Sequence, residues 1–150
     1  NDISLNKNVK FNNKILHQSK LLNYFIKDLN NEKISKDANE ILKKIKSNKK
    51  YKFSRKDKIL LDSLRYDGID IQKKYDNLYE KDPNIPTDLQ VLINNNNIGM
   101  ILLRLVEIIG EDQIENLGTE TLYFITAVLN ETNLDNLRNK IIIKTLPNRV

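Results

Sequence analysis

Cysteine is absent from this chain of 150 residues, histidine occurs once and glycine only 4 times. Without cysteine the chain has no disulfides, thiol nucleophiles, or cysteine-ligated zinc or iron–sulfur sites. The single histidine, His17, excludes a histidine-rich metal site unless a second chain contributes, and we expect it on a helix surface. So few glycines do not supply a glycine-rich phosphate loop. We therefore expect no enzyme here: no catalytic residue, no cofactor and no metal site.

The remaining composition is that of a folded domain. Hydrophobic residues make up 39% of the chain and charged residues 30%, enough apolar material for a modest core. The longest dense apolar stretch, residues 98–109, is too short to span a membrane and is interrupted by Arg104 and Glu107. The chain does not begin with methionine, so the lack of a visible leader says nothing about compartment. We expect a soluble protein, with cytoplasm and periplasm both open.

The charge is divided unequally along the chain. Residues 1–80 hold 19 lysines and arginines against 11 acidic residues, a net charge of +8, whereas residues 81–150 hold 6 against 9, a net charge of −3. A basic half attracts nucleic acid, anionic lipid or acidic protein. The alternative is codon bias in an A+T-rich genome, since the chain has 22 asparagines, 20 lysines and 20 isoleucines but only 5 arginines.

Apolar residues recur every three or four positions along most of the chain, which predicts helices. The expected helices cover residues 13–29, 35–45, 54–68, 71–79, 87–93, 98–109, 120–129 and 134–146, of which 71–79 is the weakest. The segment 98–109 is apolar almost all round, which is typical of a central, covered helix. On the last helix we expect Leu137 and Ile141 to face inward.

Polar residues at the helix ends predict caps. N-caps are expected at Ser35, Ser54, Thr87, Asn97 and Thr119. Ser54 and Asp57 have the spacing of a capping box, although aspartate replaces the usual glutamate. Gly68 is placed to end its helix in a left-handed conformation, and Gly110 and Pro147 end later helices.

The fold class predicted is all-α, with seven or eight helices arranged as hairpins in an irregular bundle or a short α-solenoid. Pro83 and Pro86 break the helical pattern and predict an internal boundary. It divides a basic amphipathic part, residues 1–82, from an apolar helical-hairpin part, residues 83–150, within one continuous globular unit.

One lysine-rich cluster is the strongest local chemical signal. This basic patch consists of Lys43, Lys44, Lys46, Lys49, Lys50, Lys52, Arg55, Lys56 and Lys58. Tyr51 and Phe53 are interleaved with it, so one interpretation is sequence-independent nucleic-acid binding through phosphate contacts and base stacking. The other is a solvated turn between helices, with Tyr51 and Phe53 packed inward.

Three weaker signals have ordinary structural interpretations. Residues 67–70 (Asp-Gly-Ile-Asp) lack the ligand spacing of a calcium loop and predict a helix-ending turn. Arg104 and Glu107 predict an ion pair on a helix surface rather than part of an acid–base site. The sequon at Asn130 is expected by chance in an asparagine-rich chain and is assigned no role.

Three stretches of the C-terminal third carry a resemblance: residues 102–111 (LLRLVEIIGE), 120–125 (ETLYFI), and 137–139 (LRN) with 146–150 (LPNRV). Together they resemble the C-terminal end of large uncharacterised helical proteins of alphaproteobacteria. The resemblance covers about residues 98–150. It implies terminal helical hairpins of an α-solenoid and a chain that is the C-terminal part of a larger protein, and it transfers no functional residue.

These observations predict a non-enzymatic helical module for protein–protein interaction. Its expected partner is another protein or the remainder of a parent chain, and a homo-oligomer is compatible with the same pattern. The alternative is non-specific nucleic-acid binding through the lysine-rich half.

Overall fold

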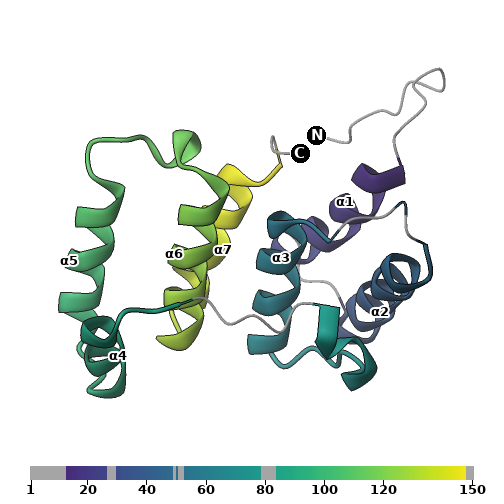
Figure 1. The fold of residues 1–150 in the computed structure, drawn as a ribbon, viewed down its shortest axis with the longest axis horizontal. Helices are drawn as coiled ribbons and strands as arrows, with labels where there is room; N and C mark the ends of the chain where they lie inside the picture. The colour runs from purple at the N-terminus through teal and green to yellow at the C-terminus, as the bar shows by residue number, and fades with distance from the viewer. Residues whose placement is uncertain (1–12, 27–29, 49, 51–52, 79–83, 148–150) are drawn as a thin grey trace.

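The computed structural model describes residues 13–26, 30–48, 50, 53–78 and 84–147, and every regular element in these ranges is helical. The elements, drawn in Figure 1, are α1 (Asn13–Ile26), α2 (Asn31–Ser47), α3 (Arg55–Tyr66), η1 (Lys73–Leu78), α4 (Thr87–Asn94), α5 (Ile98–Ile109), η2 (Ile114–Asn116), α6 (Thr119–Glu131) and α7 (Asp135–Thr145). The all-α prediction is confirmed, and within the weak segment 71–79 the structure has a 3₁₀ helix at Lys73–Leu78. Within the described ranges, no helix is long and apolar enough to cross a membrane.

Two predicted N-caps are confirmed. The Ser54 side chain accepts a hydrogen bond from the Asp57 backbone N–H, and the Asp57 carboxylate accepts one from the Ser54 backbone N–H, which completes the capping box. Asn97 caps α5 by accepting a hydrogen bond from the Met100 N–H. Both helices therefore begin where the sequence predicts.

The caps predicted at Ser35, Thr87 and Thr119 are wrong. α2 already begins at Asn31, because Asn30 Oδ1 accepts a hydrogen bond from the Glu32 N–H at 2.8 Å and asparagine caps as well as serine does. Ser35 instead donates its hydroxyl hydrogen to the Asp70 carbonyl at 2.5 Å. Thr87 and Thr119 are each the first residue of their helix and follow cap positions without a side-chain hydrogen bond.

Three helices end with the same backbone motif. α3, α4 and α6 are each followed by a residue of positive φ: Gly68 (82°), Asn96 (53°) and Asn133 (56°). At the end of α6, for example, the Leu134 N–H donates to the Leu129 carbonyl at 3.1 Å, the long hydrogen bond of a Schellman motif. The prediction for Gly68 is confirmed, and asparagine takes the glycine role at the other two ends.

The centre of the molecule is the packing of α3 against α6. Leu60 and Leu64 of α3 and Leu122, Ile125 and Leu129 of α6 are all buried in the core. α7 lies behind α6 in Figure 1 and packs against both α6 and α1, and α1 in turn packs against α2. The α4–α5 hairpin lies at the opposite end from α2. Consecutive hairpins are thus not stacked in chain order, which matches the irregular bundle among the two architectures predicted.

α3 and α6 run parallel to each other. Arg55 Nε lies 2.6 Å from Glu120 Oε1 where both helices begin, and the Tyr66 hydroxyl donates to the Glu131 carboxylate where both end. The α3–α6 helix pair joins residues on either side of the predicted division between residues 82 and 83. That division stays a prediction, because residues 79–83 lie outside the described ranges.

Two burial predictions on the C-terminal helices are wrong. α5 buries only Ile101 and Leu105 and lies at the edge of the bundle, so it is not a central helix. On α7, Ile141 is buried as predicted, but Leu137 is 38% exposed because Arg138 takes the inward position beside it. In both helices apolar residues outnumber the positions that the bundle covers.

We expect Asn133→Ala to lower the free energy of unfolding by about 1 kcal/mol, because a Cβ-bearing residue other than asparagine is strained at positive φ. Asn133→Gly should retain or exceed the stability of the parent chain. Asn136→Ala, an exposed change within α7, is the matched control and should cost nothing. Urea unfolding followed by circular dichroism measures all three, and an equal effect of the two alanine variants would contradict the assignment.

Candidate functional site

A buried polar network surrounds Arg138, whose side chain is 0% exposed. Its guanidinium makes a bidentate pair with Asp67, with Nη1–Oδ1 at 2.9 Å and Nη2–Oδ2 at 2.7 Å. Nη1 also donates to Asn130 Oδ1 at 2.9 Å, and Nη2 donates to Asn139 Oδ1 at 2.8 Å. The Tyr24 hydroxyl completes the cluster by donating to Asp67 Oδ2 at 2.8 Å. One arginine therefore joins α1, the end of α3, α6 and α7.

The chemistry of this network is structural. Burial, followed by the hydrogen bond and charge of Asp67, raises the pKa of Tyr24 to about 12, so the phenol keeps its proton near neutral pH. The guanidinium donates to carboxylate and amide oxygens, and because its side chain is 0% exposed it offers no surface to a substrate. The predicted turn at residues 67–70 is confirmed, and Asp67 serves the ion pair with Arg138.

The network also determines whether the sequon asparagine, Asn130, is accessible. The Asn130 side chain is buried, and its carbonyl oxygen accepts the hydrogen bond from Arg138. A glycan on this nitrogen needs an accessible surface position. The folded chain does not present one.

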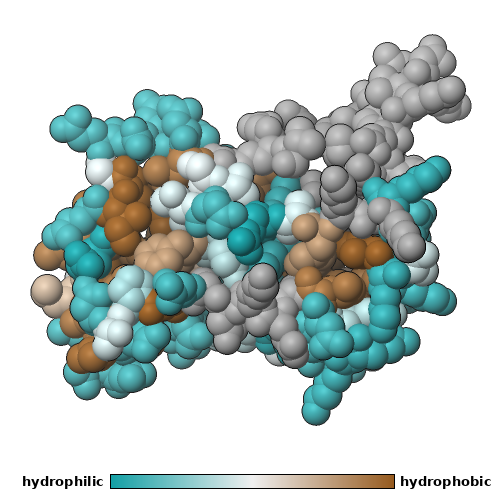
Figure 2. Space-filling model, in the orientation of Figure 1, coloured by the Kyte–Doolittle hydropathy of each residue, from teal (hydrophilic) through white to brown (hydrophobic). Residues whose placement is uncertain are grey.

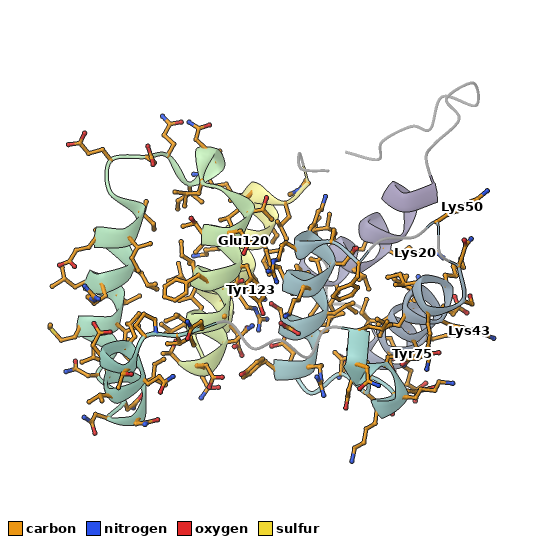
Figure 3. The ribbon with its side chains drawn as sticks, viewed as in Figure 1. Lys20, Lys43, Lys50, Tyr75, Glu120 and Tyr123 are labelled. Carbon is orange, nitrogen blue, oxygen red and sulfur yellow. The ribbon has the colours of Figure 1, made fainter. Side chains whose placement is uncertain are left out.

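The basic patch is divided by the fold. Lys43, Lys44, Lys46 and Lys50 are exposed on α2 and just beyond it. Lys49 and Lys52, with Tyr51, lie outside the described residues, and Phe53 is half-buried against the core. Figure 3 shows Lys43 and Lys50 pointing away from the bundle. The exposed part that the structure describes is therefore the α2 surface.

The other members of the patch lie at the start of α3, beside α6. Arg55 pairs with Glu120, and its guanidinium lies 5.1 Å from the centre of the Tyr123 ring, while Lys58 Nζ lies 5.0 Å from the same ring. Figure 3 shows Glu120 and Tyr123 on the side of α6 that faces α3. Lys56 and Lys58 are buried, and burial lowers the pKa of Lys56. Arg55 and Lys58 are thus part of the α3–α6 contact.

α5 presents an outward apolar face, defined here as Met100, Leu103 and Val106. These residues are spaced by three and share one side of the helix, with exposed fractions of 46%, 51% and 62%. Val91 of α4 is also half-exposed. Figure 2 shows hydrophobic side chains reaching the surface at this end of the molecule. Large apolar residues gathered in this way mark interaction surfaces on folded proteins.

The polar residues beside this face form ion pairs. Arg104 pairs with Glu107 at 3.5 Å as the sequence predicts, and it makes a shorter pair with Asp88 of α4 at 2.7 Å. The second pair joins the two helices of the α4–α5 hairpin. The predicted Arg104–Glu107 surface ion pair is thus confirmed.

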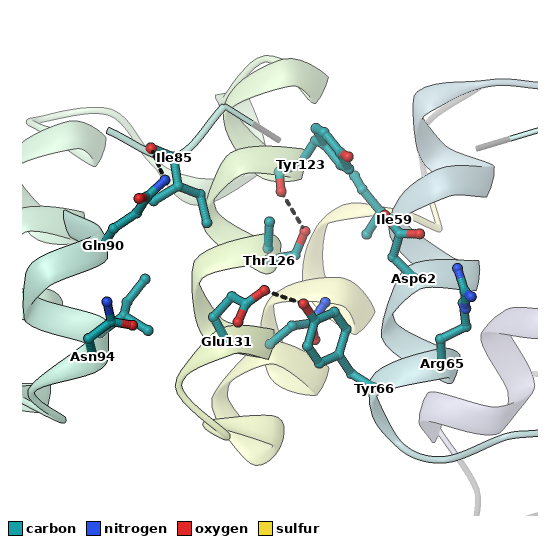
Figure 4. Close-up of a pocket in the computed structure, with 13 residues that line it drawn as sticks. Ile59, Asp62, Arg65, Tyr66, Ile85, Gln90, Asn94, Tyr123, Thr126 and Glu131 are labelled. Atoms are coloured by element: carbon teal, nitrogen blue, oxygen red, sulfur yellow. Dashed lines mark hydrogen bonds between the residues drawn. The ribbon is translucent and has the colours of Figure 1, made fainter. Parts of the chain in front are cut away.

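A groove of about 900 Å³ opens between α3, α4 and α6. Figure 4 shows its three sides, with α6 between the other two helices. Its floor is one stripe of α6 between Tyr123 and Glu131, and one wall is a stripe of α3 between Ile59 and Tyr66. The other wall is Ile85 with Gln90, Ile93 and Asn94 of α4. We call this the α3–α4–α6 groove.

The ranges that the structure describes contain no cluster of acidic residues and histidines suited to a metal ion. The His17 side chain lies outside what the structure describes. Comparison of the chain with protein-family models, curated proteins and solved structures found no match. The resemblance of residues 98–150 to alphaproteobacterial helical proteins therefore stays a prediction.

Tyr24→Phe tests the network through its pH dependence. The Tyr24 pKa is about 12 in the folded chain and 10.0 ordinarily, so its contribution to stability is complete below pH 10 and is lost as the pH rises towards 12. At pH 7 the variant should be less stable by about 1 kcal/mol, the value of one hydrogen bond. The deficit should narrow between pH 10 and 12. Urea unfolding at stepped pH measures it, and a deficit that is constant up to pH 12 would argue against the Tyr24–Asp67 bond.

Proposed function

We propose that this chain is a non-enzymatic helical module for protein–protein interaction, and that it binds through the outward apolar face of α5. The observation that carries the proposal is the exposure of Met100, Leu103 and Val106 on one helix side. Because about half of each side chain is already covered, leaving the rest in water forgoes about 1 kcal/mol for each side chain that a partner would bury. A helix this apolar gains stability from a covered position, and the chain's own bundle covers only its opposite side.

The surroundings of the face suit an interface. Protein interfaces commonly have an apolar centre and a polar rim. Here Arg104, Asp88 and Glu107 are partly exposed and paired with one another beside the apolar residues. Such pairs contribute little affinity, but they restrict how a partner is oriented.

The partner is an apolar helical surface of another protein or, as the sequence resemblance implies, of the remainder of a parent chain. A second copy of this chain offers the same surface, because two α5 helices can pack face to face across a twofold axis. The face is small compared with a standard interface of about 800 Å² per partner, so self-association of the isolated chain should be weak.

We expect the isolated chain to dimerise reversibly at high concentration and the double variant Leu103→Asp/Val106→Asp to stay monomeric. Both residues are more than half exposed, so the fold should tolerate the change. Ile26→Asp on α1, at 54% exposure, is the matched control and should dimerise like the parent chain. Light scattering over a concentration series measures this, and a strictly monomeric parent chain would contradict the proposal.

Nucleic-acid binding is the second candidate, and the exposed lysines of α2 favour it. Lys46 Nζ lies 3.4 Å from the Lys74 carbonyl oxygen, so this surface continues onto η1. Tyr75, the aromatic residue between them, is buried and offers no stacking face to a base. Binding here would be electrostatic and should weaken steeply with salt.

Gel mobility of short DNA and RNA at low salt tests this second candidate. Lys43→Gln/Lys46→Gln/Lys50→Gln should reduce any shift, whereas Lys140→Gln on α7 should not. Unchanged mobility with the parent chain would remove the candidate.

A further inference from the structure

The α3–α4–α6 groove has about the size and shape of a short helix. Its floor and two walls are each one helical stripe, and every lining residue of α6 falls at a spacing of three or four from the next, or beside it on the same face. From Tyr123 to Glu131 the floor is about 12 Å long, which is about two turns of helix. A cylinder ~10 Å wide and two turns long also has a volume close to that of the groove.

The groove lining is mostly polar, with carboxylates at the edges. Its aliphatic surface comes from Ile85, Ile93 and Ala127, which are each partly exposed. The carboxylates of Asp62 and Glu131 border the groove, and the one cation among its lining residues, Arg65, pairs with Asp76 at 3.2 Å. An occupant with an apolar stripe and basic flanks complements this surface.

The helices of the groove also give it an electrostatic direction. α3 and α6 are parallel, and Figure 4 shows Gln90 and Asn94 of α4 following the same direction, with Asn94 near the Glu131 end. The C-terminal ends of the three helices therefore meet at one end of the groove. Each such end carries a partial negative charge, so cations are stabilised there.

From this placement we propose that the α3–α4–α6 groove binds a basic amphipathic helix antiparallel to α6. Its apolar stripe would lie on Ile93 and Ala127. Its first turns would carry lysine or arginine beside Glu131, where its own positive N-terminal end meets the three negative ends. This site goes beyond the α5 face, since it lies on different residues and selects a partner by charge and direction.

The test uses two labelled synthetic peptides of leucine, alanine and lysine, each about 14 residues long with helical apolar periodicity. They have the same composition, but the lysines lie in the first turns of one peptide and in the last turns of the other. Fluorescence anisotropy with the full chain should show the first peptide binding about fivefold or more tightly than the second. No binding of either peptide, or equal affinity for both, would overturn the proposal.

Substitutions of the groove carboxylates test whether the first peptide binds in the α3–α4–α6 groove. Asp62→Asn/Glu131→Gln removes two groove carboxylates and should weaken binding of the first peptide about fivefold or more, and Glu131→Gln alone should have a smaller effect in the same direction. The matched control Glu111→Gln/Asp112→Asn removes two exposed carboxylates beyond α5 and should change affinity less than twofold. Circular dichroism melting establishes that each variant is folded. Equal weakening by both double variants would overturn the groove assignment.

The α5 proposal and the groove proposal can be contradicted separately. Leu103→Asp/Val106→Asp should abolish self-association and leave binding of the first peptide intact. Loss of peptide binding in that variant would place the peptide on α5 and overturn the groove proposal. A monomeric parent chain that still binds the first peptide directionally would overturn the α5 proposal alone.

Discussion

The ion pair between Arg138 and Asp67 fixes how the end of α3 meets α7. A guanidinium that is fully buried is costly to desolvate, and removing one member of a buried pair typically costs about 3–5 kcal/mol. That cost applies to every arrangement in which the end of α3 moves away from α7. Because Asn130 is bonded to the same guanidinium, the end of α6 is held level with the end of α3. The parallel α3–α6 packing, the Tyr66–Glu131 contact and the groove above them depend on this register.

Asparagine does in this chain much of what glycine does in others. With 4 glycines and 22 asparagines, the chain uses Asn96 and Asn133 for left-handed helix ends, because a short amide side chain tolerates positive φ better than most. Asn30 and Asn97 cap helix starts, and Asn130 supplies a carbonyl oxygen to the buried arginine. The structure thus gives a physical reason why these particular positions hold asparagine.

The sequence predicts those parts of the fold that depend on local interactions. The helix ends at Ser54, Gly68 and Asn97 depend on residues a few positions apart, so they are readable from spacing. Burial depends on which helix covers which face, and periodicity carries no such information for α5, where apolar residues surround the axis. Arg138 was missed for the same reason, although one signal was present: it precedes Ile141, Ile142 and Thr145 at spacings of three, four and seven, so it lies in the apolar stripe of its own helix. The groove has no sequence signal, since its three sides come from separate helices.

The α4–α5 hairpin links the two candidate surfaces mechanically. α4 forms one wall of the groove, α5 carries the outward apolar face, and the Arg104–Asp88 pair joins the two helices. Leu89, Ile101 and Leu105 are the side chains through which the hairpin is buried, a small contact beside the extensive α3–α6 core. A shift of the hairpin therefore changes the width of the groove at lower cost than any shift of α3 or α6. If a partner on α5 prefers one hairpin position, thermodynamic linkage requires that it change the affinity of the groove for its helix by the same factor in both directions.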